Sequence, residues 1–127
     1  MITLYGIKNC DSVKKARQWL TQNAVDYAFH DFRAQGLTPP LLDGWLREVG
    51  WETLLNRRGS TWRQLPDSLK AGVDASSARG LMLDHPTLIK RPVLVMDSAH
   101  LVGFTNAMYE AFFSHHGKLT EVNQGKQ

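Results

Sequence analysis

The sequence predicts an α/β domain in which a β-α-β half and a β-β-α half are separated by an all-helical insertion. The segment 2–20 begins with a short β-branched and aromatic run, passes through a polar turn and becomes helical. The apolar run 93–96 precedes a second short strand and a helix. Between them, from about residue 38 to 86, the predicted elements are all helices. A chain of 127 residues suits one domain with one core.

The first half contains a helix flanked by two strands. In its helical stretch, apolar residues recur on one face, at Val13, Ala16, Trp19 and Leu20. The segment 26–32 predicts a second strand, in which Tyr27, Phe29 and Phe32 are expected to be packing residues. We expect the loop 33–37 to follow this strand.

The insertion begins at Thr38, a predicted N-cap, with Pro39 at the first helical position. Apolar residues at helical spacing then continue to Val49, and Gly50 ends the helix. The segment 51–55 predicts a short helix or turn, and 56–60 a basic loop. A further helix is predicted over 76–84, where His85-Pro86 stops it.

The second half follows the insertion. The continuous apolar run 93–96 predicts a strand buried on both faces. A turn at 97–99 and a short hairpin partner at 100–103 come next, followed by a helix at 105–113 with Thr105 as its cap. We expect residues 1–116 to form the single domain and the polar segment 117–127 to be a flexible tail.

Composition excludes several classes of protein. Hydrophobic residues make up 43% and charged residues 21%, and no stretch approaches the ~20 apolar residues of a membrane span. The N-terminus lacks the pattern of an export signal, and one cysteine cannot form an internal disulfide, so we expect a cytoplasmic protein.

A net charge of +3 fits a site for small anions at least as well as a nucleic-acid surface. The basic residues of the insertion are few and lie in no known nucleic-acid motif, so nucleic acid is not an expected partner. The histidines at 85, 115 and 116 have no cysteine or carboxylate cluster at metal spacing, so no metal site is expected.

Cys10, the only cysteine, stands where the first strand gives way to the first helix. A thiol at a helix N-terminus meets unpaired backbone N–H groups and the positive end of the helix dipole, and both favour the thiolate. Lys8, Lys14 and Lys15 add positive charge nearby, while the adjacent Asp11 opposes them or caps the helix. We therefore interpret Cys10 as a reactive nucleophile rather than a small buried hydrophobe.

Three pieces of the chain together carry a family resemblance. Cys10 follows the first strand within residues 5–16, the run P-x-L-I-x-R-P occupies 86–92, and Leu-Leu-Asn-Arg-Arg-Gly occupies 54–59. This combination resembles the ArsC arsenate reductase family, which includes Spx-type regulators and the YffB-like proteins, and residues 5–16 look closest to the YffB-like branch. The resemblance implies a thioredoxin-like fold with Pro92 in the cis form, which would bring Arg91 near Cys10.

A thiolate and an anionic substrate repel each other unless cations lie between them. Arginine binds carboxylates and oxyanions through a planar two-point fork and stays charged. Arg91 is the first candidate for this role, and Arg57 or Arg58 is the second, although an ungapped reading puts the family's arginine at Asn56. The other candidate anion- or glutathione-binding residues are Lys8, Asn9, Ser12 and Pro92.

The chain also departs from the arsenate reductases that it resembles. Gly6 stands in place of a histidine, Val13 in place of a serine, and residues 101–104 contain no arginine. These departures argue against arsenate reduction. Val13 also occupies the second cysteine position of the Cys-x-x-Cys switch in Spx-type regulators, so an intramolecular disulfide is excluded.

These observations favour the hypothesis that the protein is a glutathione-linked thiol oxidoreductase without a tightly bound cofactor. Cys10 would attack a small oxyanion or a disulfide, and glutathione, as co-substrate, or glutaredoxin would supply the second thiol because the chain has none. The alternatives are glutaredoxin-coupled arsenate reduction and a non-enzymatic, Spx-like regulator that binds RNA polymerase.

Overall fold

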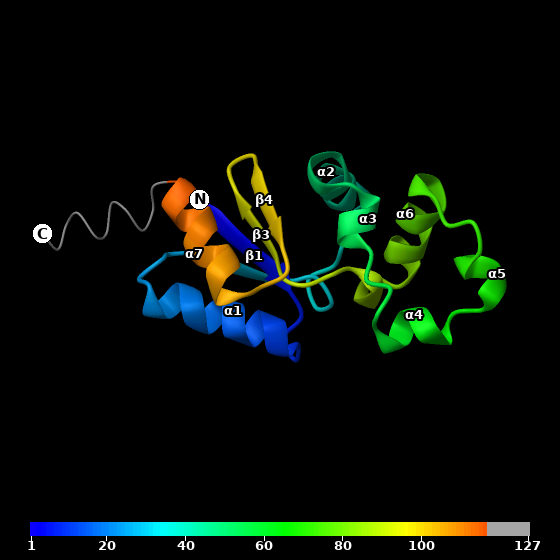
Figure 1. Ribbon diagram of the computed structural model, residues 1–127, viewed down its shortest axis with the longest axis horizontal. Coiled ribbons are helices and arrows are strands. Elements are labelled where there is room, and N and C mark those ends of the chain that lie inside the picture. Colours follow the sequence, from blue (N-terminus) through cyan, green and yellow to red (C-terminus); the bar gives the residue numbers. More distant parts are fainter. Residues whose placement is uncertain (117–127) are drawn as a thin grey trace, which may run out of the picture.

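A computed structural model of the chain describes residues 1–116, and the predicted tail at 117–127 lies outside them. Its centre is one sheet with the strand order β2-β1-β3-β4 (Figure 1). The strands are β1 (Ile2–Gly6), β2 (Ala28–Asp31), β3 (Val93–Met96) and β4 (Ala99–Val102). β1 runs parallel to β2 and antiparallel to β3, and β3 pairs antiparallel with β4. The predicted β-α-β and β-β-α halves are therefore confirmed.

Two helices cover one face of the sheet. They are α1 (Asp11–Gln22) and α7 (Asn106–His115), which lie together on one side of the sheet in Figure 1. The apolar residues predicted for one face of α1 are all buried. Trp19 packs on Tyr109 and Phe113 of α7, with ring centroids 5.4 Å apart in both pairs. Thr105 caps α7, as predicted, by accepting a hydrogen bond from the N–H of Met108.

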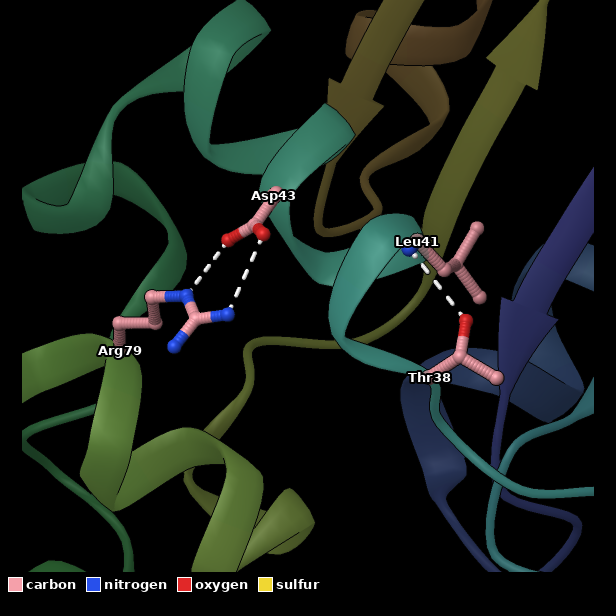
Figure 2. A network of polar contacts seen from close by, with 4 residues as sticks. All are labelled: Thr38, Leu41, Asp43 and Arg79. Atoms are coloured by element: carbon pink, nitrogen blue, oxygen red, sulfur yellow. Dashed lines mark hydrogen bonds and ion pairs between the residues drawn. The ribbon is translucent and has the colours of Figure 1, made fainter.

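The helix α2 (Pro39–Val49) packs on the other side, where it contacts β4 and buries Trp45 against Phe32 and Tyr5. Thr38 caps α2 as the sequence predicts, since its hydroxyl oxygen accepts a hydrogen bond of 3.4 Å from the N–H of Leu41 (Figure 2). No helix among residues 1–116 is long and apolar enough to cross a bilayer.

The rest of the insertion extends away from the sheet (Figure 1). It comprises α3 (Trp51–Leu54), α4 (Ser60–Gln64), α5 (Asp67–Lys70), α6 (Ala75–Asp84) and the 3₁₀ turn η1 (Pro86–Leu88). Arg79 of α6 donates two hydrogen bonds, of 2.7 and 3.2 Å, to the carboxylate of Asp43 on α2 (Figure 2). This fork ties the outer part of the insertion to the helix that packs on the sheet.

A single β-bridge connects the insertion to the segment that leads into β3. Leu55 pairs with Ile89. On either side of this pair, the N–H of Asn56 donates to the carbonyl of Leu88 at 2.7 Å, and the N–H of Lys90 donates to the carbonyl of Leu54 at 2.8 Å. Leu55 and Ile89 are both almost fully buried, so the bridge is part of the core. It holds Asn56 beside the residues that precede Pro92.

Candidate active site

The chemistry-bearing residues gather at one edge of the sheet because of its strand directions. β1, β2 and β4 end at this edge and β3 begins there, since β3 runs in the direction opposite to the other three strands. Four segments therefore meet. Cys10 follows β1, Arg33 follows β2, Arg91 precedes β3 and Phe104 follows β4.

Cys10 is the N-cap residue of α1. Its N–H donates to the carbonyl of Ile7 at 3.2 Å, and its carbonyl accepts from the N–H of Lys14 at 3.0 Å. Its half-buried side chain makes no capping hydrogen bond. Asp11 is the first helical residue and is therefore not the cap, contrary to one of the two roles considered for it. Cys10 thus lies at the positive end of the helix dipole.

Two open hollows meet at Cys10 and Arg91, which line both of them. The first, the Arg33 hollow, has a volume of about 150 Å³, and its other walls are Ile7, Asn9, Arg33 and Thr87. The second, the Asn56 hollow, has a volume of about 320 Å³, and its other walls are Ser12, Asn56, Lys90, Gly103 and Phe104. The fold thus brings Cys10, Arg91, Asn9 and Ser12 together, and their roles as ligands of a substrate stay predictions.

Arg91 is half-buried, and its own segment holds it in place. Its Nη1 donates to the carbonyls of Thr87 and Ile89, at 2.9 and 3.0 Å. Its Nε is buried and has no acceptor among residues 1–116, and no carboxylate of that part lies within 4.0 Å of the guanidinium. The Arg91–Pro92 peptide bond is cis, as the resemblance implied. An arginine with spare donors therefore lies beside the only thiol.

Pro92 is buried, and it connects the site to the end of β4. Its carbonyl accepts a hydrogen bond of 2.8 Å from the N–H of Gly103. The left-handed backbone of Gly103, with φ of 87°, turns the chain there, and Phe104 then reaches the Asn56 hollow. Pro92 thus supports the site through its backbone.

Arg57 and Arg58 lie in a different place from Cys10. With Glu52, Leu55 and Lys90 they line a third hollow, of about 290 Å³. The guanidinium of Arg57 lies over the ring of Trp51, 5.1 Å from its centroid. Lys90 lines both this hollow and the Asn56 hollow. The exposed Lys8 is not among the residues that line the hollows at Cys10.

Sequence reasoning missed Arg33 and the buried carboxylate that positions it. Asp31, which is 7% exposed, accepts hydrogen bonds from the N–H groups of Arg33, Ala34 and Lys8, at 2.9, 3.2 and 3.4 Å. Burial opposes ionisation of this carboxyl, but the three N–H donors outweigh it and lower the pKa of Asp31. The sequence signal for this part of the site was Asp31 at the end of the predicted second strand. Strands that run parallel end at the same edge of a sheet, so this strand ends beside the Cys10 loop.

The described part of the chain has no cluster suited to a metal. Within residues 1–116, no group of three or more histidine, cysteine, aspartate or glutamate side chains lies close enough together to hold an ion.

The fold is thioredoxin-like, with the helical insertion between its two halves. The sequence model of the ArsC family matches residues 5–112, which is most of the chain, and this protein therefore belongs to the ArsC family.

Three similar proteins support this assignment. A solved structure named YFFB protein is 48% identical, spans 87% of this chain and 97% of its own, and superposes with a TM-score of 0.83. An arsenate reductase related protein from Brucella melitensis is 54% identical over 88% of this chain and 93% of its own, with a TM-score of 0.74. An uncharacterized protein of Haemophilus influenzae is 42% identical over 114 residues, which cover 90% of this chain and all of that protein.

More distant relatives include regulators. The global transcriptional regulator Spx of Streptococcus pyogenes is 27% identical over 126 residues, which cover 98% of this chain and 93% of the regulator.

Proposed function

We propose that this protein is a glutathione-linked thiol oxidoreductase in which Cys10 is the nucleophile. The observation that carries the proposal is the shared position of Cys10 and Arg91 at the junction of two open hollows. The thiol lies at a helix N-terminus, and the guanidinium beside it has no carboxylate partner among residues 1–116. This arrangement attracts an anionic substrate to the thiol.

The reaction proceeds by two thiol–disulfide exchanges. In the first, the Cys10 thiolate attacks the glutathionyl sulfur of a mixed disulfide, so that a bond from Cys10 Sγ to that sulfur forms while the original S–S bond breaks. The electron pair leaves with the other sulfur as a thiolate, which takes a proton from water. In the second, the thiolate of free glutathione attacks the same sulfur, releasing Cys10 as a thiolate together with glutathione disulfide.

The need for an external thiol supports glutathione as co-substrate. Cys10 is the only cysteine of the chain, so no internal thiol can resolve the adduct. Glutathione carries carboxylates, which the cations around Cys10 attract. The reducing compartment expected for a protein with a single cysteine, the cytoplasm, supplies glutathione and glutaredoxin.

Turnover of a glutathionylated peptide by reduced glutathione tests this function. The wild-type protein should accelerate release of the free peptide, and Cys10→Ser should abolish the acceleration. A matched Ser98→Ala variant, altered in the exposed β3–β4 turn, should keep full activity. Equal rates with the wild type and Cys10→Ser would refute the proposal. Arsenate in place of the peptide, with glutathione and glutaredoxin present, tests the activity named in the Brucella melitensis relative.

A second candidate function is non-enzymatic regulation of the Spx kind, by binding to RNA polymerase. The 27% identity to Spx along nearly the whole chain favours it, and the insertion offers a surface separate from the sheet. Such a module would bind its partner without turning over glutathione. A pull-down of purified RNA polymerase that is equally strong with the wild type and Cys10→Ser, together with no turnover, would favour this candidate.

A further inference from the structure

We propose that Arg33 is the second cation of the Cys10 site, and that Arg33 and Arg91 together bind a carboxylate of the thiol or disulfide substrate. This inference rests on the proposed function and assigns the substrate class of the same site. Arg33 lies outside the segments 5–16, 54–59 and 86–92 that carry the family resemblance.

The two guanidinium groups line one hollow together with the thiol. The Arg33 hollow contains Cys10, Arg33 and Arg91 but no acidic side chain among its walls. No carboxylate of residues 1–116 lies within 4.0 Å of a nitrogen of either arginine, whereas Arg79 in the insertion has Asp43 as its partner. Two unpaired arginines beside a thiol repel each other unless an anion enters between them.

A shared anchor fixes the backbone of Arg33 relative to the Cys10 loop. The carboxylate of Asp31 accepts hydrogen bonds from the N–H of Arg33 on one side and from the N–H of Lys8 on the other. The N–H of Phe32 also donates to the carbonyl of Gly6 at 3.0 Å, which extends the β1–β2 ladder toward the loops. These hydrogen bonds therefore connect the backbones of the two loops, while Arg33 itself is exposed.

The size and charge of the two hollows indicate which part of a substrate each accepts. The Arg33 hollow, at about 150 Å³, is small beside the roughly 300–1,000 Å³ of most ligand pockets, so it fits one functional group. The larger Asn56 hollow has Lys90 as its only cation besides Arg91. The Arg33 hollow therefore offers a carboxylate two guanidinium groups, those of Arg33 and Arg91, in a space that fits this one group.

The ratio of Cys10 alkylation by iodoacetate to that by iodoacetamide tests the charge of this hollow. The two reagents differ by one carboxylate, so their ratio reports the attraction of an anion to the thiol. We expect Arg33→Gln to lower the ratio by about threefold to fivefold, and Arg33→Lys to lower it less. The control Arg47→Gln, which removes an exposed arginine from α2, should leave it unchanged. An unchanged ratio in Arg33→Gln, or an equal fall in Arg47→Gln, would overturn the proposal.

A pair of disulfides tests the substrate class. Glutathione disulfide carries carboxylates, and bis(2-hydroxyethyl) disulfide carries none. Arg33→Gln should slow exchange of Cys10 with the first and leave exchange with the second unchanged. Equal slowing with both would mean that Arg33 acts only on the shape of the loop, and would overturn the assignment. The alkylation ratio needs no glutathione, so a fall in that ratio without glutathione turnover would retain the anion site and reject only the glutathione-linked activity.

Discussion

A Cβ atom added to Gly6 would lie 2.6 Å from Cγ2 of Val13, closer than packed carbon atoms approach, and 3.1 Å from Cγ1. Gly6 ends β1, and Val13 lies fully buried in the first turn of α1, three residues after Cys10. The sequence departs from the arsenate reductases at these same two positions, where they have histidine and serine. The two departures are therefore one packing contact, in which the bulk of Val13 fills the space left by Gly6.

This contact predicts that substitutions at the two positions are not additive. Gly6→Ala should destabilise the protein by roughly 1–3 kcal/mol, because the added methyl group overpacks the site. In a Val13→Ala background the same change should cost less, because the methyl groups that it meets are gone. Urea denaturation of the wild type, both single variants and the double variant measures this coupling. Strictly additive losses would contradict the contact.

The elements predicted well from sequence carry local signals. The side chains of Thr38 and Thr105 cap the helices that follow them, and Pro39 is the first residue of α2. The apolar run 93–96 forms the strand β3. The helices α4 and α5 were not predicted individually because each spans at most five residues and buries no residue fully. Such short segments have too few residues to show a helical period.

The site was predictable only where one segment carries its own signal. Cys10 stands out because its position before α1 is local, and Arg91 because of its motif before Pro92. Arg33 was missed because its position beside Cys10 depends on the pairing of β1 with β2. No residue of the loop that contains Arg33 indicates this pairing. The same limit applies to Asp31, whose partners come from two different loops.

The carboxylate of Asp31 should contribute a pH-dependent part of the stability. Its pKa is lowered on folding, so its stabilising effect is present above the unfolded value of 3.8 and is lost as the pH falls through the folded value. Asp31→Asn places an amide donor near the N–H of Lys8 and should be less stable at neutral pH. Denaturation curves from neutral pH to about pH 2 should show this difference shrinking below pH 3.8. A difference that stays constant over the whole range would exclude the carboxylate as its cause.

The reaction of Cys10 with glutathione disulfide should be slowed even by a substitution of Arg91 that conserves the charge. Arg91→Lys should slow the reaction of Cys10 with glutathione disulfide, because a compact ammonium lacks the planar guanidinium that donates to the carbonyls of Thr87 and Ile89 through one nitrogen and leaves other nitrogens for a ligand. Arg91→Ala should weaken the interaction further, by roughly 1.5–3 kcal/mol. Adduct formation followed by mass spectrometry measures both effects, with thermal unfolding as a check that each variant folds. Unchanged rates in folded Arg91→Ala would remove Arg91 from the site.

The fork between Arg79 and Asp43 should affect the stability of the insertion but not the thiol. The guanidinium of Arg79 donates a hydrogen bond to Asp43 and lowers the pKa of that carboxyl. Arg79→Gln should therefore lower the melting temperature slightly, and the loss should diminish at high salt because both side chains are partly exposed. The alkylation rate of Cys10 in the folded variant should equal that of the wild type. A marked change in that rate would show that the insertion controls the thiol.

The proposed function requires that Cys10 form and then release a mixed disulfide with glutathione. The most direct measurement is the intact mass of the reduced protein after treatment with glutathione disulfide, and again after addition of reduced glutathione. We predict one glutathionyl group on the wild type, none on Cys10→Ser, and loss of that group when reduced glutathione is added. A wild-type protein that gains no glutathionyl group, or a Cys10→Ser variant that gains one, would contradict it.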